Sequence, residues 1–84
     1  MTGSPLEVRI AAVIAETFEV DAATVNAQSA PATIPNWDSL GHLNLVTALE
    51  KAFGIAFTMD EILAMSDAGA ILKMLSGRGG EVSP

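Results

Sequence analysis

Asn36-Trp37-Asp38-Ser39-Leu40-Gly41-His42-Leu43 is the stretch in which an irregular segment turns into a helix, and the rest of the chain is organised around it. Asp38 is a favourable N-cap, because its carboxylate can accept hydrogen bonds from the N–H groups of the first helical turn. Ser39 then takes the first helical position. We therefore expect a primary hydroxyl to be exposed at the start of a helix.

The helix that starts at Ser39 is predicted to continue to about Phe53. At about 100° per residue, a stripe roughly 100° wide collects the side chains that we expect to be buried. These are His42, Leu45, Val46, Leu49 and Phe53. Leu40 lies nearly opposite the stripe, and an exposed leucine beside an exposed serine indicates a docking surface. Gly54 ends the helix, because a left-handed C-cap costs glycine no steric penalty.

Upstream, apolar residues recur at steps of three and four over residues 5–19. This period predicts a first helix, with Ser4 as its N-cap and Pro5 in the favoured first position. The charged residues of this segment fall outside the apolar stripe and are expected to face solvent. They are Glu7, Arg9 and Glu16.

From residue 20 to residue 37 the helical period stops, and turn-forming residues take its place. This composition predicts a long loop. Structureless connections longer than about 12–15 residues are uncommon in compact domains, so apolar side chains should hold the loop against the core. The expected anchors are Val25, Ile34 and Trp37.

Two cap signals downstream predict two more helices. Thr58-Met59-Asp60-Glu61 is a capping box, in which the threonine hydroxyl accepts from the glutamate N–H while the glutamate reaches back. It predicts a short helix over residues 59–64. Ser66, followed by Asp67, is interpreted as the N-cap of a last helix, which Gly77 is expected to end.

These elements predict an all-α fold, a four-helix bundle with a short third helix and a long first loop. The 84 residues are enough for one small domain. The chain has no cysteine, so packing of helices has to hold it together. We expect a disordered N-terminus over residues 1–4, the folded domain over 5–76 and a disordered C-terminus over 77–84.

Ten acidic residues against four basic ones give a formal net charge of −6. This charge repels a phosphate backbone and an anionic membrane surface, so neither nucleic acid nor a membrane is an expected partner. A basic patch on another protein fits better. The apolar runs fall short of the roughly 20 residues that span a bilayer, and the start lacks a signal-peptide pattern. We expect a cytoplasmic monomer.

The residues around Ser39 also carry a resemblance to a known family. Asp38-Ser39-Leu40 at a helix start, together with the pattern that follows it, is similar to the acyl carrier protein family over about residues 5–76. The matching residues downstream are Leu43, Leu45-Val46, Ala48-Leu49-Glu50, Phe53-Gly54-Ile55, Phe57 and Asp60-Glu61. The tripeptide alone is a weak signal, but its place at a helix start and the acidic entry to the next helix make the combination specific.

The resemblance implies that a phosphopantetheinyl transferase moves 4′-phosphopantetheine from coenzyme A onto Ser39. The thiol of this covalent cofactor then carries an acyl group as a thioester, so the protein is a carrier and not an enzyme. Its other partners would be an acyl-loading ligase or synthase and acyl-processing enzymes. Trp37 and the Gly41-His42 pair are similar to stand-alone carriers encoded with dedicated ligases or synthases.

In the family, the second helix and the segment after it form the surface that partner enzymes recognise. The positions carried over to this chain are Asp38, Leu40, Leu43, Asn44, Thr47, Glu50, Lys51, Phe57, Met59, Asp60 and Glu61. Four of them depart from the family pattern. Asn44 and Met59 replace acids, Thr47 replaces a larger apolar residue, and Lys51 adds a positive charge. We interpret these departures as the mark of a specialised lipid, polyketide or related biosynthetic pathway.

Other interpretations remain open at this point. A peptidyl or aminoacyl carrier shares the attachment chemistry, although Ile34-Pro35-Asn36-Trp37 lacks the glycine-rich approach typical of that class. An unmodified interaction module would dock through Leu40 alone. His42, three residues after Ser39, raises the question of a serine–histidine dyad. Its position on the helical wheel points toward the core, which favours a packed histidine. The Asp60-Glu61 pair offers too few oxygen ligands for a hard cation, so no metal site is expected.

A core rich in methionine and alanine would also let the helices part around an acyl chain. We expect such a pocket to be lined by apolar side chains of the second helix and of the segments that face it. These are Leu45, Val46, Leu49, Phe57 and Ile71.

Overall fold

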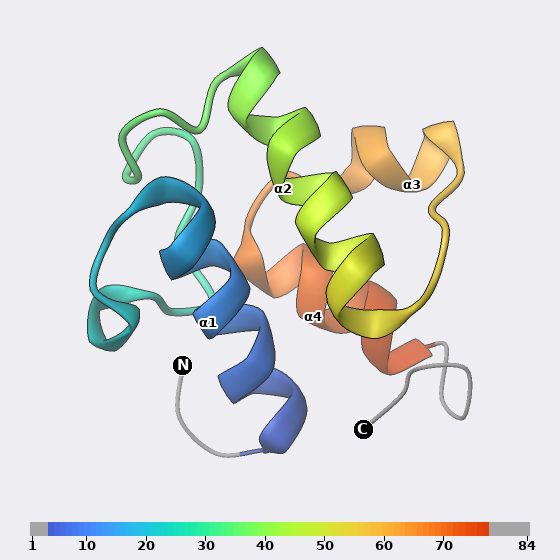
Figure 1. Ribbon diagram of the computed structural model, residues 1–84, viewed down its shortest axis with the longest axis horizontal. Helices are drawn as coiled ribbons and strands as arrows, with labels where there is room; N and C mark the ends of the chain where they lie inside the picture. Colours follow the sequence, from blue (N-terminus) through green and yellow to red (C-terminus); the bar gives the residue numbers. More distant parts are fainter. Residues whose placement is uncertain (1–3, 78–84) are drawn as a thin grey trace.

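The computed structural model of the protein describes residues 4–77 and shows a bundle of helices (Figure 1). In chain order its elements are α1 (Pro5–Phe18), the 3₁₀ helix η1 (Ala22–Thr24), α2 (Ser39–Phe53), α3 (Met59–Ala64) and α4 (Ala68–Gly77). No strand is formed over this range. The prediction of an all-α fold with a short third helix and a long first connection is confirmed. The 3₁₀ helix was not expected.

Side-chain N-caps begin α1 and α3, and a left-handed glycine ends α2, as the sequence indicates. The backbone N–H of Glu7 donates to the hydroxyl of Ser4 at 3.2 Å, which starts α1. Thr58 and Glu61 form both hydrogen bonds of the capping box at the start of α3. Gly54 takes a left-handed φ of 65° and ends α2. The bounds predicted for α2 and α3 are thus confirmed.

The cap predicted for the last helix was wrong by one residue. The Oδ1 atom of Asp67 accepts from the backbone N–H of Ala70 at 2.7 Å, so Asp67 and not Ser66 caps α4. A carboxylate is favoured at this place, because it also faces the positive end of the helix dipole. Gly77 is the last residue of α4. The remainder of the predicted disordered ends, residues 1–3 and 78–84, lies outside the described range.

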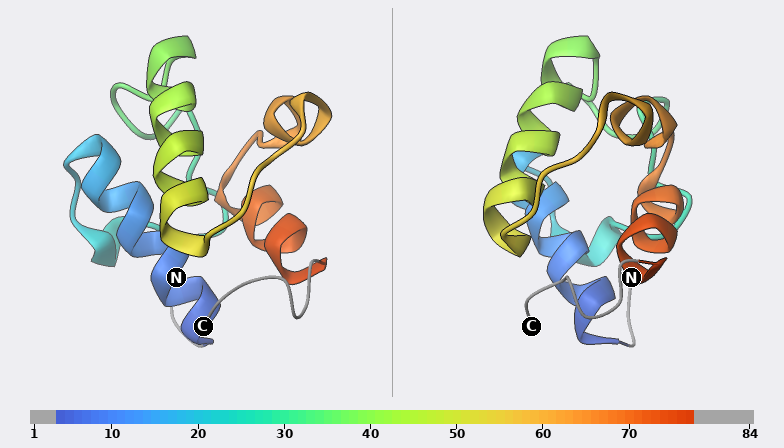
Figure 2. Two further views of the ribbon diagram at one scale, coloured as in Figure 1. Left: turned by 45° about the vertical axis from the view of Figure 1, so that its right-hand side comes forward. Right: turned by 90° about the vertical axis from the view of Figure 1, so that its right-hand side faces the viewer.

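The core lies where α1, α2 and α4 meet. Each of these helices contributes side chains that are at most 1% exposed, namely Ile10, Ile14, Leu45, Leu49, Phe53, Ile71 and Leu75. By contrast, α3 contributes no buried side chain. It lies at the end of the bundle where α2 begins, away from α1 (Figures 1 and 2). None of the helices described is long and apolar enough to cross a membrane.

The long connection between α1 and α2 is held against the core by the expected anchors. Val25, Ile34 and Trp37 are 1%, 6% and 2% exposed. The connection also bonds to the start of α4, since the backbone N–H of Ala68 donates to the carbonyl of Ser29 at 2.8 Å. The buried apolar side chains and the backbone hydrogen bond to α4 together explain how an irregular segment of this length is held in one conformation.

Arg9 corrects a prediction, because it does not simply face solvent. Its Nη2 donates to the carbonyl oxygen of Ala52 at 2.6 Å, and its guanidinium carbon lies 4.5 Å from the centroid of the Phe53 ring. The side chain thereby places a cation at the C-terminal end of α2, where the helix dipole and the aromatic face both favour it. Arg9 fastens α1 to the far end of the helix that Ser39 begins.

Candidate functional site

Ser39 is the first residue of α2, and its side chain is exposed as expected. Asp38 precedes it in an extended conformation, and Oδ1 of Asp38 accepts from the N–H of Gly41 at 2.9 Å. The carbonyl of Asp38 accepts from the N–H of His42 at 2.7 Å and begins the helical ladder. The cap therefore fixes the backbone on either side of the serine while its hydroxyl faces outward.

Gly41 allows the loop before Ser39 to pass directly over the first turn of α2. A Cβ atom at this position would overlap the carbonyl oxygen of Asn36 and would come within 2.9 Å of Cε1 of Phe18. Asn36 itself takes a positive φ of 72°, which turns the chain toward the helix. The sequence alone did not assign this role to the glycine, because the close approach is a tertiary contact.

Trp37 and His42 form a hydrogen-bonded chain that reaches α3. The indole Nε1 of Trp37 lies 3.0 Å from Nδ1 of His42, and Nε2 of His42 lies 2.8 Å from the carbonyl oxygen of Ile62. An indole N–H can only donate, so Nδ1 of His42 is the acceptor of this bond. The hydrogen of the neutral ring is then on Nε2, which donates to the carbonyl oxygen of Ile62. Both ring nitrogens are thus engaged away from Ser39. The histidine is packed, as expected, and forms no dyad with the serine.

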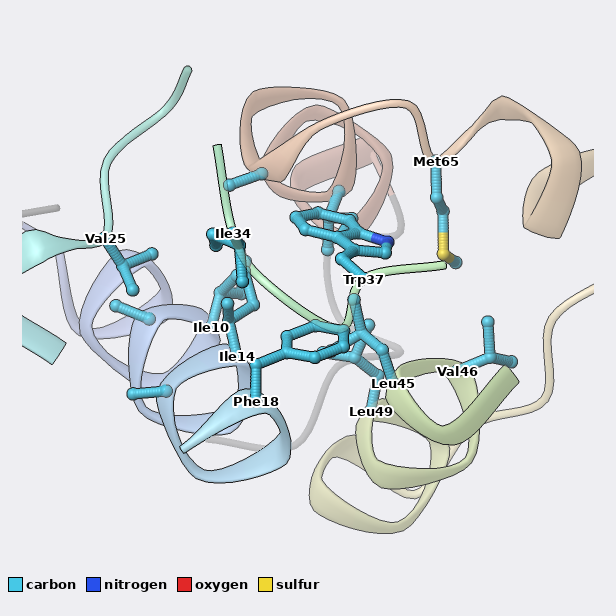
Figure 3. Packing of buried hydrophobic residues seen from close by; sticks show 14 of the residues in the cluster. Ile10, Ile14, Phe18, Val25, Ile34, Trp37, Leu45, Val46, Leu49 and Met65 are labelled. Carbon is cyan, nitrogen blue, oxygen red and sulfur yellow. The ribbon is translucent and has the colours of Figure 1, made fainter. Parts of the chain in front are cut away.

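The Trp37 side chain is itself held by an aromatic stack. Its ring centroid lies 5.4 Å from that of Phe18, with 20° between the ring planes, and 6.3 Å from that of His42, with 13° between the planes. Figure 3 shows the indole over the Phe18 ring in the core. The loop before Ser39 is therefore anchored to α1.

A largely apolar groove of about 520 Å³ opens beside Ser39. One side is formed by the loop and the start of α2, and the other side is formed by α3. Its lining consists of Pro31, Trp37, Asp38, Ser39, His42, Leu43, Met59, Ile62 and Leu63. The hydroxyl therefore lies at the edge of an apolar depression that is open to solvent.

Exposed apolar side chains lie in the groove wall at Leu43, Met59 and Leu63, and Leu40 is exposed next to Ser39 in the chain. Leu40 and Leu43 on α2 are 69% and 56% exposed, and Met59 and Leu63 on α3 are 67% and 75% exposed. The exposure predicted for Leu40 is confirmed. Leu63 was missed by the sequence reasoning, because a six-residue helix is too short for its faces to be told apart by period.

The other residues expected to meet partners divide into two sets. The first set is exposed, and consists of Asp38, Asn44, Thr47, Lys51 and Asp60. The second set serves the fold: Oε2 of Glu50 accepts from the N–H of Phe57 at 2.9 Å, and Oε1 of Glu61 accepts from the N–H of Thr58 at 2.9 Å. Phe57 is 9% exposed and belongs to the core. The two carboxylates thus hold the segment that leads into α3, and Phe57 offers a partner little apolar surface.

The residues expected to line an acyl pocket lie together in the packed core. Leu45, Val46, Leu49, Phe57 and Ile71 are each at most 9% exposed. The groove beside Ser39 is lined by other side chains. Among residues 4–77, no three His, Cys, Asp or Glu side chains come close enough together to hold a metal ion.

A search against family models finds no match for this chain. Curated relatives are found, and they bear the name acyl carrier protein AcpXL. The protein of Rhizobium etli is 38% identical over 53 residues, which cover 63% of this chain and 58% of the relative. The proteins of Brucella melitensis biotype 1 and Brucella suis biovar 1 are also 38% identical over 53 residues, covering 57% of each relative. The chain is similar to acyl carrier proteins.

This similarity confirms the resemblance found in the sequence around Ser39. The name of the relatives denotes carriers and not enzymes, in agreement with the expectation for this chain. The aligned stretch spans less than two thirds of each acyl carrier protein that it matches.

Proposed function

We propose that the protein is a monomeric, cytoplasmic acyl carrier that receives 4′-phosphopantetheine on Ser39 and carries acyl groups as thioesters in a specialised lipid, polyketide or related biosynthetic pathway. The observation that carries this proposal is the exposed hydroxyl at the first position of α2, at the edge of an apolar groove. The acyl carrier name of the relatives supports it.

The position of Ser39 suits the attachment reaction. A bond forms between Oγ and the phosphorus that bears the pantetheine of coenzyme A, the pyrophosphate bond breaks, and adenosine 3′,5′-bisphosphate leaves. The serine proton passes to a base of the transferase. An exposed hydroxyl allows the transferase to approach, and the positive end of the α2 dipole favours the phosphodiester anion that results. The bound group supplies the thiol for the thioester, since the chain has no cysteine.

The partners fall into three classes: a phosphopantetheinyl transferase, an acyl-loading ligase or synthase, and enzymes that process the acyl group. Each must approach Ser39 past the exposed leucines of α2 and the exposed side chains of α3. Asp38 and Asp60 add negative charge to this face, which suits a partner with basic side chains. Apolar contact and charge attraction therefore act together in recognition.

The proposal of a specialised pathway depends on the exposed residues of α2 and α3 that depart from the family pattern. Asn44, Thr47, Lys51 and Met59 are all exposed, so a partner meets them directly. An enzyme adapted to a strongly acidic helix would find the neutral Asn44 in place of an acid and the positive charge of Lys51 on α2. Such an enzyme should bind this carrier more weakly than a dedicated partner does.

The experiment is to incubate the protein with coenzyme A, magnesium and a broad-specificity phosphopantetheinyl transferase, and to measure its intact mass. We expect a gain of one phosphopantetheine in the wild type and in the control Ser66→Ala, and no gain in Ser39→Ala. No gain in the wild type would favour an unmodified interaction module. A gain that persists in Ser39→Ala would place the attachment on another residue.

Loading assays on the modified protein separate an acyl carrier from a peptidyl or aminoacyl carrier. Enzymes that load fatty acyl groups and enzymes that load amino acids are offered the same preparation. We expect acyl thioester to form and aminoacyl thioester not to form. The reverse result would assign the protein to the peptidyl class.

A further inference from the structure

α3 forms one wall of the groove beside Ser39, although its own side chains bury little apolar surface. None of its side chains is buried, and Met59 and Leu63 are 67% and 75% exposed. Ile62 is half-buried at the groove. The flanking Phe57 and Met65 are 9% and 2% exposed and hold the two ends of the helix, but the helix itself removes little apolar area from water, so its polar contacts also determine its position.

One polar contact joins α3 directly to the start of α2. Nε2 of His42 lies 2.8 Å from the carbonyl oxygen of Ile62, near the end of α3, where helical carbonyls lack partners within the helix. The same oxygen accepts a longer bond of 3.3 Å from the N–H of Met65. His42 therefore makes the shorter of these two bonds, across a separation of 20 residues in the sequence.

Trp37 and Ile62 together fix which nitrogen of His42 carries the proton. The indole N–H of Trp37 occupies Nδ1 at 3.0 Å, so the ring donates through Nε2. Trp37 is only 2% exposed and stacks on Phe18 of α1, so it cannot turn aside without disturbing the core. The His42 ring that contacts Ile62 is therefore held in position by the buried Trp37 side chain.

We propose that His42, held in its Nε2–H tautomer by Trp37 and Ile62, is a positioning residue that ties α3 to the start of α2 and sets the width of the groove beside Ser39. It acts through the carbonyl of Ile62 on the wall that presents Met59 and Leu63. This role rests on the proposed function of Ser39 for its meaning in acyl carriage. The contacts that define it are independent of that function.

The tautomer is tested first, by ¹⁵N NMR of the imidazole in the uniformly labelled full chain. The expected spectrum shows a protonated Nε2 and an unprotonated Nδ1 for His42, with a slowly exchanging indole proton of Trp37. Trp37→Phe removes the donor at Nδ1 and keeps an aromatic ring, so it should shift the Nδ1 resonance while the carbonyl of Ile62 still holds the proton on Nε2. A protonated Nδ1 in the wild type, or an Nδ1 resonance that does not move in Trp37→Phe, would overturn the assignment.

A matched pair of variants then tests the tie to α3. The amide of His42→Gln reaches the place of Nε2 and can still donate to Ile62, whereas the shorter amide of His42→Asn reaches only the place of Nδ1. We expect the amide protons of Ile62 and Met65 to exchange about tenfold faster in His42→Asn and within about threefold of the wild type in His42→Gln. Amides of α1 should exchange at wild-type rates in both.

Two outcomes would contradict the positioning role. Equal acceleration in α1 and α3 would mean that His42 supports the whole fold and not the place of one helix. Equal exchange of the α3 amides in the glutamine and asparagine variants would mean that the donor at Nε2 does not matter. Both patterns can be distinguished even where one variant is less stable, because the exchange rates of the α1 amides serve as the internal reference.

Kinetics of the transferase test what the position of α3 does for recognition. In His42→Asn we expect the KM for the carrier to rise about three- to tenfold while kcat stays within about twofold, since the cap and hydroxyl of Ser39 are untouched. A fall in kcat at unchanged KM would overturn the proposal. If the wild type gained no mass, the proposed function would fail, while the NMR comparison would still decide the tie between His42 and Ile62.

Discussion

The region where α1, α2 and α4 meet differs sharply from the region around α3, although α2 belongs to both. In the first, large apolar side chains such as Leu49 and Phe53 are entirely buried. In the second, α3 buries no side chain; the Glu50 carboxylate bonds the segment that leads into it, the His42 ring bonds the carbonyl of Ile62, and the flanking Phe57 and Met65 are buried. Burial along whole helices thus stabilises one region, whereas directed hydrogen bonds and two flanking buried side chains position the other.

This difference explains how one small chain can be stable and still offer a variable surface. Replacing an exposed side chain on α3 removes little buried area, so its face can change without loss of the fold. The core residues have no such freedom, because interiors are packed at high density. Substitutions in the core should therefore change stability, whereas substitutions of exposed residues on α3 should change recognition by partners.

The largest effect on stability is expected in the core. Leu49→Ala should lower the free energy of unfolding by about 2–5 kcal/mol, because it leaves a cavity among fully buried side chains. Leu63→Ala, the matched change on α3, should alter it by at most about 0.5 kcal/mol. Urea denaturation followed by circular dichroism measures both. Similar losses in the two variants would refute the contrast between the regions.

Gly41→Ala is expected to come next, because the loop before Ser39 and the Phe18 ring of α1 both lie directly against this residue. A methyl group here meets the carbonyl of Asn36 and the ring of Phe18, so the loop before Ser39 must shift. We expect a loss of about 1–3 kcal/mol in the free energy of unfolding, the usual cost of overpacking. Asn44→Ala, an exposed change on the same helix, is the control in the same denaturation experiment. A loss no greater than that of the control would contradict the close approach.

Asp38→Ala should have a smaller effect, about 1 kcal/mol, through the loss of the N-cap of α2. Asp38→Asn keeps an oxygen that can accept from the N–H of Gly41 and should retain most of the stability. Thermal unfolding of the two variants side by side measures the difference. If both were equally destabilised, the charge of Asp38 and not its hydrogen bond would be the stabilising feature.

Leu40→Ala should have the smallest effect on stability, within about 0.5 kcal/mol, and yet weaken recognition by the transferase. The side chain is 69% exposed beside Ser39, so its apolar surface is available to a partner. Val8→Ala, on a 52% exposed residue of α1, is the matched control. Steady-state kinetics should show a raised KM for the carrier in the first variant only. A raised KM in both variants would remove the special role of Leu40.

The local signals of the sequence predicted most of the fold. The bounds of α2 and α3 follow from the cap at Asp38, the glycine at residue 54 and the capping box, all of which act within a few residues. The anchors of the long loop were also predictable, because Val25, Ile34 and Trp37 are the large apolar residues of a polar segment. The hydroxyl of Ser39 at the helix start follows from the same cap.

Contacts between distant residues could not be predicted in this way. Arg9 meets the carbonyl of Ala52 across 43 residues, and no local pattern shows that a charged residue of α1 ends opposite the C-terminus of α2. The bond from His42 to Ile62 is of the same kind, although the inward direction of His42 was correctly expected. The place of Leu63 in the groove wall likewise depends on how α3 is attached. The wall of the candidate site thus depends on tertiary contacts, whereas its serine depends on a local cap.

Peptide mapping by mass spectrometry tests the central claim most directly, since it locates the attached group on the chain. The protein is treated with coenzyme A, magnesium and transferase, then digested and fragmented. The account predicts that the full added mass of phosphopantetheine lies on Ser39. An unmodified Ser39, or the same mass on another hydroxyl such as that of Thr58 or Ser66, would contradict it.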